Sequence, residues 1–177
     1  MKNIINFWFC WKSGILLVAS GLLFGCGPSA EAKIDAEVLE QSRAEAEKGD
    51  AEAQNKLGVA YALGQGVTLD YTEAMKWYRL AADQGWPQAQ NNLGVLFRDG
   101  QGVEQDYEQA IKWFRTAADL GFAASQNNLG VMYYSAQGVP QDHEEALKWI
   151  GKAADQGHEN AAKNLIQMKG GEHNHDH

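Results

Sequence analysis

The chain has 177 residues, with 23 acidic and 15 basic side chains and a formal net charge of −8. An acidic protein repels phosphate backbones, so nucleic acid is not expected among its partners. Two cysteines in the whole chain are too few for a disulfide-rich scaffold, so packing must hold the fold together.

The first 25 residues are similar to a secretory signal. Lys2 and Lys12 flank an apolar start, and residues 14–24 read GILLVASGLLF without a charge. The letters LFGC at 23–26 resemble the lipobox of bacterial lipoproteins, which implies cleavage before Cys26 and lipid attachment there. A plain signal and an uncleaved anchor are the alternatives. Cleavage would leave 13 basic and 23 acidic residues, a charge of −10.

A repeat of 36 residues occupies most of the remaining chain. The letters NNLGV stand at 91–95 and again at 127–131. Segments 86–121 and 122–157 are identical at 19 of 36 positions. A period of roughly 20 to 50 residues is typical of solenoids, in which each unit buries its apolar face against its neighbours.

Each unit has the pattern of two helices. In the middle unit, apolar residues at helical spacing predict a first helix over 88–97, with the small Gly94 on its buried side. The letters GQGV at 100–103 predict a loop. A second helix is expected over 107–120, with Trp113 facing inward. The sequence therefore predicts an all-α fold, an α/α solenoid of helix-turn-helix repeats.

The repeated pattern L-G-x-x-Y/F, G-x-G-V, D-x-x-x-A-x-x-W and A-A-x-x-G resembles the Sel-one-like repeat, a relative of the tetratricopeptide repeat. The first unit carries it at Leu57, Gly58, Tyr61, Gly64, Gly66, Val67, Asp70, Ala74, Trp77, Ala81, Ala82 and Gly85. Ala136 departs from it, standing where the other units have Gly64 and Gly100. The third loop must therefore change its shape or tolerate strain.

The expected organisation follows the period. It comprises a lipoprotein-type signal at 1–25, a linker at 26–32, an N-terminal half repeat at 33–49, repeats at 50–85, 86–121 and 122–157, a C-terminal half repeat at 158–169 and a histidine-rich tail at 170–177.

No catalytic arrangement is expected. His143 and His158 have no Ser or Cys nucleophile in a motif context, and Asp83 recurs once per unit, which indicates a structural or solvated position. Some Sel-one-like proteins are cysteine-rich and have been linked to β-lactam binding, but this chain has neither paired cysteines nor an S-x-x-K motif. The protein is predicted to be no enzyme and to need no cofactor.

A partner-binding surface is predicted on the first helix of each pair. The resemblance to tetratricopeptide arrays implies that these helices line a concave groove, where asparagines grip the backbone of an extended peptide. Amides offer both donors and acceptors for that contact. The predicted residues are Asn55, Val59, Asn91, Val95, Arg98, Asn127, Val131 and Tyr134.

Two further expectations concern these amides and the partner's charge. The amides could instead form hydrogen bonds between repeats, Asn92 and Asn128 above all. Lys56 and Arg98 do not recur, so a basic clamp for a terminal carboxylate is poorly matched. A neutral or basic partner segment is therefore expected.

The predicted function is a protein–protein interaction scaffold or adaptor of the bacterial cell envelope. No retention aspartate follows Cys26, so a lipid anchor would place the solenoid on the outer membrane, facing the periplasm. The alternative is a metal-binding envelope lipoprotein. Its weak site for zinc, nickel or copper would be formed by His173, His175 and His177, which otherwise belong to a polar tail.

Overall fold

The computed structural model describes residues 30–172, and it describes side chains over 39–169. Within that range every element is a helix, as the sequence predicts. The helices are α1 (Ala30–Glu47), α2 (Ala51–Leu63), α3 (Tyr71–Asp83), α4 (Pro87–Asp99), α5 (Tyr107–Asp119), α6 (Ala123–Tyr134), α7 (His143–Asp155) and α8 (Glu159–Glu172). The predicted signal, Cys26 and the three tail histidines lie outside the described residues.

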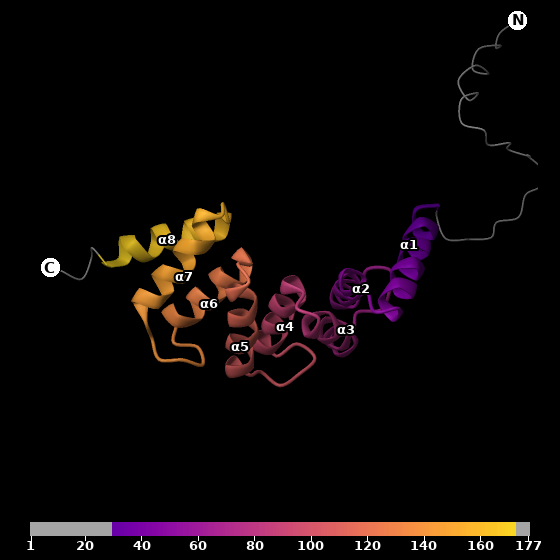
Figure 1. Cartoon of the computed structure of the whole chain (residues 1–177), viewed down its shortest axis with the longest axis horizontal. Coiled ribbons are helices and arrows are strands. Elements are labelled where there is room, and N and C mark those ends of the chain that lie inside the picture. The colour runs from indigo at the N-terminus through magenta and orange to yellow at the C-terminus, as the bar shows by residue number, and fades with distance from the viewer. Residues whose placement is uncertain (1–29, 173–177) are drawn as a thin grey trace, which may run out of the picture.

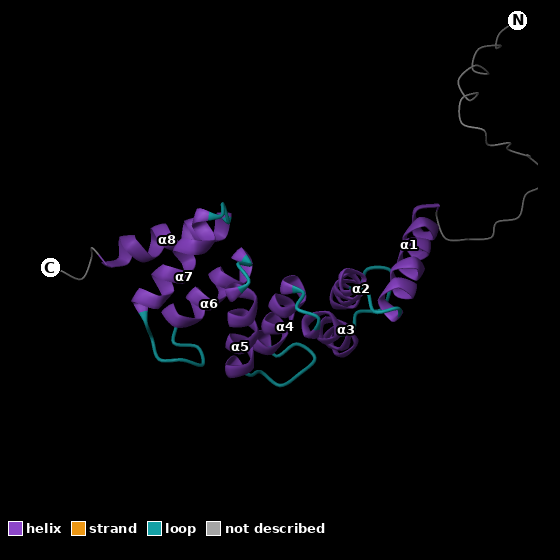
Figure 2. Cartoon of the chain, in the orientation of Figure 1, coloured by secondary structure: helices purple, strands orange, loops and turns teal. Residues whose placement is uncertain are grey.

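The helices stack in chain order into a curved array (Figure 1). The pairs α2–α3, α4–α5 and α6–α7 pack most extensively, and α1 and α8 each cover one end as a half pair. The ends of the array rise on the same side, so the chain forms an arc, joined by short turns and by longer loops within each pair (Figure 2). Helices α2 and α4 lie on the inner side of the arc relative to α3 and α5.

Aspartates define the start of the second helix in each repeat. The carboxylate of Asp70 accepts backbone hydrogen bonds of 2.9 and 3.0 Å, and those of Asp106 and Asp142 each accept one of 2.9 Å. These bonds satisfy N–H groups that have no partner within a helix. The recurring aspartate of the motif is therefore a helix cap.

Ala136 keeps the loop shape of the other repeats. Its φ of 54° is close to the 66° of Gly64 and the 67° of Gly100, and it is the one non-glycine with positive φ in the described part of the chain. The next amide, of Gln137, donates to the carbonyl of Met132 at 3.1 Å, as Gln101 does to Leu96 at 3.0 Å. Of the two alternatives, the structure shows a strained alanine in an unchanged loop.

A glycine on the first helix lets the second helix pack closely against it. An added Cβ would meet the ring of Tyr78 at 2.6 Å from Gly58, the ring of Phe114 at 2.6 Å from Gly94, and Ile150 Cγ1 at 2.5 Å from Gly130. The leucines that precede these glycines, Leu57, Leu93 and Leu129, are fully buried. We call this contact between the helices of a repeat the seam.

Both terminal helices extend beyond the predicted half repeats. Helix α1 begins at Ala30, three residues before the predicted start, and α8 ends at Glu172, three residues beyond the predicted end. None of the helices described between residues 30 and 172 is long and apolar enough to cross a bilayer.

Candidate partner-binding face

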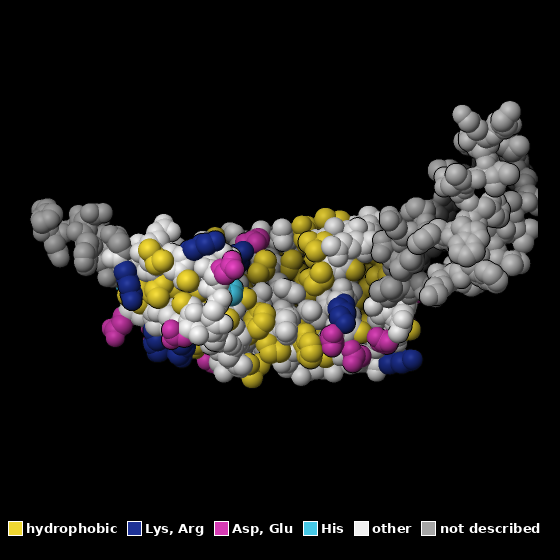
Figure 3. Space-filling model, turned by 90° about the horizontal axis from the view of Figure 1, so that it is seen from above, with side chains coloured by type: hydrophobic (Ala, Val, Ile, Leu, Met, Phe, Trp, Pro, Cys, Tyr) yellow, Lys and Arg dark blue, Asp and Glu magenta, His cyan; other side chains and the backbone are white. Residues whose placement is uncertain are grey.

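The predicted partner-binding residues lie together on the exposed side of the first helices. We call this surface the inner face; it comprises Asn55, Val59, Ala62 and Leu63 of α2, Asn91, Val95, Arg98 and Asp99 of α4, and Asn127, Val131, Tyr134 and Ser135 of α6. Seven of the eight predicted residues are half-buried, and Asn127 is buried. Seen from above the arc, hydrophobic and uncharged side chains cover most of the middle of the molecule (Figure 3).

A ladder of asparagine pairs connects neighbouring repeats on this face. In each pair the amide nitrogen of one repeat donates to the amide oxygen of the repeat before it: Asn92 to Asn55 at 3.2 Å, Asn128 to Asn91 at 3.0 Å, and Asn164 to Asn127 at 2.9 Å. Both sets of asparagines therefore take part in bonds between repeats. Contact between the first set and a partner stays a prediction.

The ladder uses the oxygens of the predicted binding residues and leaves their nitrogens. Asn91 Oδ1 accepts from Asn128 and also from the Ser125 hydroxyl at 3.0 Å, so both of its lone pairs are occupied. Within the described residues, Nδ2 of Asn55, Asn91 and Asn127 donates no hydrogen bond to the protein. The ladder could therefore offer N–H donors to the carbonyl groups of an extended segment.

A row of valines runs beside the ladder. Val59, Val95 and Val131 occupy the same position in successive repeats, and each packs against a core cluster while remaining half-buried. The inner face therefore has one partly exposed valine beside the ladder in each repeat.

The inner face of the second and third repeats carries no net charge. The Arg98 guanidinium donates to both carboxylate oxygens of Asp99, at 2.7 and 3.0 Å. This hydrogen bond raises the pKa of Arg98 despite partial burial. Residues 123–141 include no Asp, Glu, Lys or Arg. An uncharged surface on an acidic chain is suited to a segment that is recognised mainly through its backbone.

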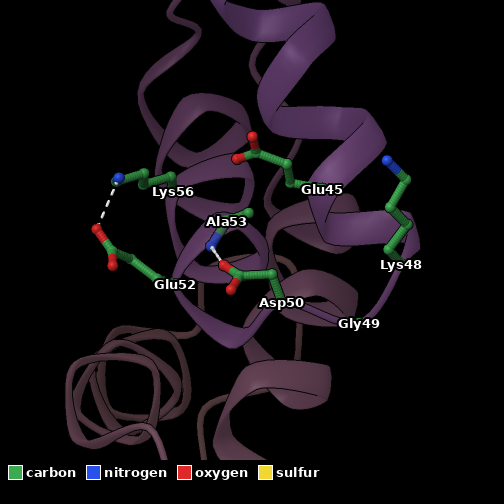
Figure 4. A pocket seen from close by; sticks show the side chains of 7 residues that line it. All are labelled: Glu45, Lys48, Gly49, Asp50, Glu52, Ala53 and Lys56. Carbon is green, nitrogen blue, oxygen red and sulfur yellow. Dashed lines mark hydrogen bonds and ion pairs between the residues drawn. The ribbon is translucent and has the colours of Figure 1, made fainter.

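A polar hollow of about 540 Å³ lies at the junction of α1 and α2 (Figure 4). It is lined by Glu45, Lys48, Gly49, Asp50, Glu52, Ala53 and Lys56. Its carboxylates already have partners: Asp50 caps α2 through the Ala53 amide at 2.7 Å, Glu52 pairs with Lys56 at 2.7 Å, and Glu45 accepts from Gln41 at 3.2 Å. The hollow therefore has no acid–base pair arranged for catalysis.

The two histidines considered for catalysis have structural contacts. The His143 ring meets the Tyr134 ring edge-on, with centroids 5.0 Å apart. His158 Nδ1 accepts from the Ala161 amide at 3.2 Å at the start of α8. Over the described residues, no three His, Cys, Asp or Glu side chains are grouped to hold a metal ion.

Two exposed leucines at the loop end of α2 do not recur in the other repeats. Leu63 and Leu69 are 60% and 51% exposed. The corresponding residues are Asp99 and Gln105 in the second repeat and Ser135 and Gln141 in the third. The signal that could have found them is the departure from the repeat pattern, not the pattern itself.

The comparisons with known proteins agree on one family. The Sel1 repeat model matches the chain three times, at residues 51–86, 87–122 and 123–158. Each match begins and ends one residue after the corresponding predicted repeat. No curated protein sequence matches the chain.

Solved structures share the fold. A protective antigen of uropathogenic Escherichia coli with an SLR fold is 46% identical, with a TM-score of 0.67 over 70% of this chain and 26% of that one. A Sel1 repeat protein from Oxalobacter formigenes is 28% identical, with a TM-score of 0.66 over 78% of this chain and 59% of that one. Cysteine-rich protein B of Helicobacter pylori is 19% identical, with a TM-score of 0.61 over 78% of this chain and all 100% of that one. The chain thus spans about a quarter of the first protein's length and three fifths of the second's.

Proposed function

This chain belongs to the Sel1 repeat family, whose members are generally protein-interaction scaffolds, and we propose that it binds an extended segment of a partner protein along its inner face. The asparagine ladder carries this proposal. The side-chain oxygens of Asn55, Asn91 and Asn127 hold neighbouring repeats together, while the amide nitrogens of these three residues donate no hydrogen bond within the described residues. They lie beside the valine row on a surface without net charge. The carbonyl groups of a segment laid along the ladder would accept hydrogen bonds from these N–H groups, and its side chains would be buried on the valines.

Charge introduced on the valine row tests this function. Asn→Ala changes are unsuitable, because they would also remove the bonds between repeats. The better variant is Val95→Glu with Val131→Glu, and the control is Thr116→Glu, an exposed position on α5. Buried in a contact with an apolar segment, each new carboxylate would lose its hydration, so we expect about a tenfold loss of binding or more.

The measurement is affinity purification from the native host after chemical crosslinking. Wild type and Thr116→Glu are expected to retain the same partner protein, and the double variant to lose it. Circular dichroism and thermal melting must first show that all three proteins fold alike. An unchanged partner in a folded double variant would overturn the proposal.

We further propose that the scaffold acts in a bacterial cell envelope, held to the outer membrane by lipid at Cys26 and facing the periplasm. The lipobox-like LFGC at 23–26 and the apolar stretch before it support this location. Mass spectrometry of the protein purified from host membranes should find acyl groups on Cys26, and Cys26→Ala should move the protein out of the membrane fraction. Membrane retention of Cys26→Ala, without lipid on the wild-type cysteine, would contradict this location.

A further inference from the structure

Helix α8 has a side that no other helix covers. It corresponds to the first helix of a repeat, since Asn164 continues the asparagine ladder by donating to Asn127 at 2.9 Å. Helix α7 covers one side of it, where Ala161 and Met168 are buried. No second helix follows α8 within the described residues, at the end of the array (Figure 1). The side on which a second helix would form the seam is therefore uncovered, and we call it the open side of α8.

The open side is apolar at its centre. Leu165 corresponds to the fully buried Leu129 and is half-buried. Ile166 stands at the position of the seam glycine Gly130 and is 74% exposed. Ala162, one turn earlier, is exposed as well. The helix that ends a solenoid is expected to have a polar outer side, so the requirements of folding do not explain these apolar residues.

The uncovered side of α1, at the opposite end of the array, is polar. This helix corresponds to the second helix of a repeat, and it has Ser42 and Glu45 where the first repeat has Tyr78 and Ala81. Glu45 is exposed. Stacking α8 of one copy on α1 of another would bury the Glu45 carboxylate against apolar residues, which is unfavourable. The α1 end is thus a solvated end, and it does not fit the open side of α8.

We propose that the open side of α8 binds the open side of α8 in a second copy of this chain, with the two helices antiparallel. Glu159, Ala162, Ile166 and Lys169 follow one another at intervals of three, four and three residues, so they lie along one stripe of the helix. An antiparallel copy that places Ile166 on the second copy's Ala162 also places Glu159 opposite the second copy's Lys169, because both pairs are centred on residue 164.

This arrangement is complementary in size and in charge. The large Ile166 meets the small Ala162, as a large side chain meets glycine at the seam of each repeat. Neither Glu159 nor Lys169 forms an ion pair within the described residues, and the two copies would form two such pairs. Helix α8 has two acidic and two basic side chains, so it carries no net charge. Lys163, at the edge of the stripe, is exposed and keeps its ammonium group in water.

The contact is the same on both copies, so the assembly closes as a two-fold dimer and does not extend into a fibre. It leaves the inner face of α2, α4 and α6 uncovered in both copies. The dimer is therefore separate from the proposed function, and it would present two inner faces in one assembly.

Sedimentation equilibrium of the purified full-length protein in a neutral detergent tests the contact. We expect a reversible dimer with a Kd of roughly 1–100 μM, because one pair of short helices buries less surface than a standard interface. Ile166→Glu would bury a carboxylate on Ala162 of each copy and should abolish the dimer. Leu80→Glu is the matched control, because Leu80 is a leucine of α3 that is 48% exposed and lies outside both surfaces. It should leave the Kd unchanged.

Charge reversal tests the antiparallel register. Glu159→Lys would place lysine opposite Lys169, and Lys169→Glu would place glutamate opposite Glu159, so each should weaken the dimer by about tenfold. The double variant restores opposite charges at the same positions, and its Kd should return to within about twofold of the wild-type value. Circular dichroism must show equal helix content in all variants.

Three results would overturn the inference: a monomeric wild type, a dimer that Ile166→Glu leaves intact, or a double variant that dimerises as weakly as the single ones. A monomeric wild type that captures another protein through Ile166, or binds phosphatidylethanolamine–phosphatidylglycerol vesicles through it, would assign the open side to that occupant and reject self-association.

Discussion

The three repeats have similar residues at the seam, but they have different residues at the loop end of the inner face. At the seam, every repeat has a glycine facing a large side chain, because an added Cβ would come within 2.5–2.6 Å of it. At the loop end of the inner face, the repeats place an exposed leucine, an ion-paired aspartate and an exposed serine at one position, Leu63, Asp99 and Ser135. Close packing restricts the first region, while solvent leaves the second free to differ between repeats.

The largest expected effect is at the seam of the third repeat. A Cβ at position 130 would lie 2.5 Å from Ile150 Cγ1 and 2.9 Å from the carbonyl oxygen of Ala146, a backbone atom that cannot rotate away. Gly130→Ala should therefore lower the free energy of unfolding by about 3 kcal/mol. Urea denaturation measures it.

The matched substitution for this test is Gly151→Ala in α7. No atom lies within 4 Å of a Cβ built there, so alanine should raise the free energy of unfolding by about 1 kcal/mol through its higher helix propensity. If the two substitutions shift stability in the same direction, packing does not restrict the seam as described.

A pH effect distinguishes the first seam from the other two. Tyr78 is buried against Gly58, and this desolvation raises the pKa of its hydroxyl from 10.0 to about 12. The folded protein therefore keeps this proton while the unfolded chain loses it, so the tyrosine's contribution is complete below pH 10 and declines between about pH 10 and 12.

Tyr78→Phe removes the titrating group and keeps the ring on Gly58. Over that pH range, wild type should lose about 2 kcal/mol more stability than the phenylalanine variant, as read from urea midpoints. Parallel pH profiles for the two proteins would contradict the assignment of the raised pKa to burial at the seam.

A smaller effect concerns a buried glutamine that accepts a hydrogen bond in the first and third repeats but not in the second. Gln84 donates to Gln54 Oε1 at 2.8 Å and Gln156 to Gln126 Oε1 at 2.7 Å, but Leu120 stands at that position in the second repeat. There the buried Gln90 Oε1 has no hydrogen-bond partner among the described residues. Leu120→Gln should restore the bond and raise the free energy of unfolding by about 1 kcal/mol.

The reverse change checks that value. Gln84→Leu should remove the same bond from the first repeat and cost about 1 kcal/mol, measured by thermal melting under identical conditions. Neutral results for both substitutions would mean that solvent replaces this hydrogen bond without cost.

The smallest expected effect is at the strained loop. Ala136→Gly relieves an alanine at φ 54°, and after the entropy cost of glycine in the unfolded chain it should gain about 0.5 kcal/mol. Gly100→Ala, at φ 67° in the second repeat, should be destabilising. A stabilising alanine at position 100 would show that the loop carries no backbone strain.

Most of the fold could be predicted from the period alone. Leu93 and Phe97 are four residues apart, and Ala110, Trp113 and Ala117 follow at i, i+3 and i+7, so each set shares one face of a helix and the repeat is expected to contain two paired helices. The outcome at Ala136 could not be predicted, since a strained loop and a reshaped loop differ by only about 1–2 kcal/mol.

Less of the candidate site could be predicted from the sequence. Recurrence placed Asn55, Asn91 and Asn127 on one surface, but which of their atoms bond to neighbouring repeats depends on the spacing of the stacked helices. The repeat pattern does not point to Leu63 and Leu69, because they do not recur, and their exposure follows only from how the helices pack.

A photoreactive amino acid at two positions of the second repeat tests most directly whether the inner face binds the partner. One is Asp99, on the inner face, and the other is Thr116, exposed on α5. After irradiation in the native host, the residue at 99 should crosslink one protein, which the residue at 116 should not. A protein captured from position 116 and absent at position 99 would place the partner on the outer helices and contradict the proposed function.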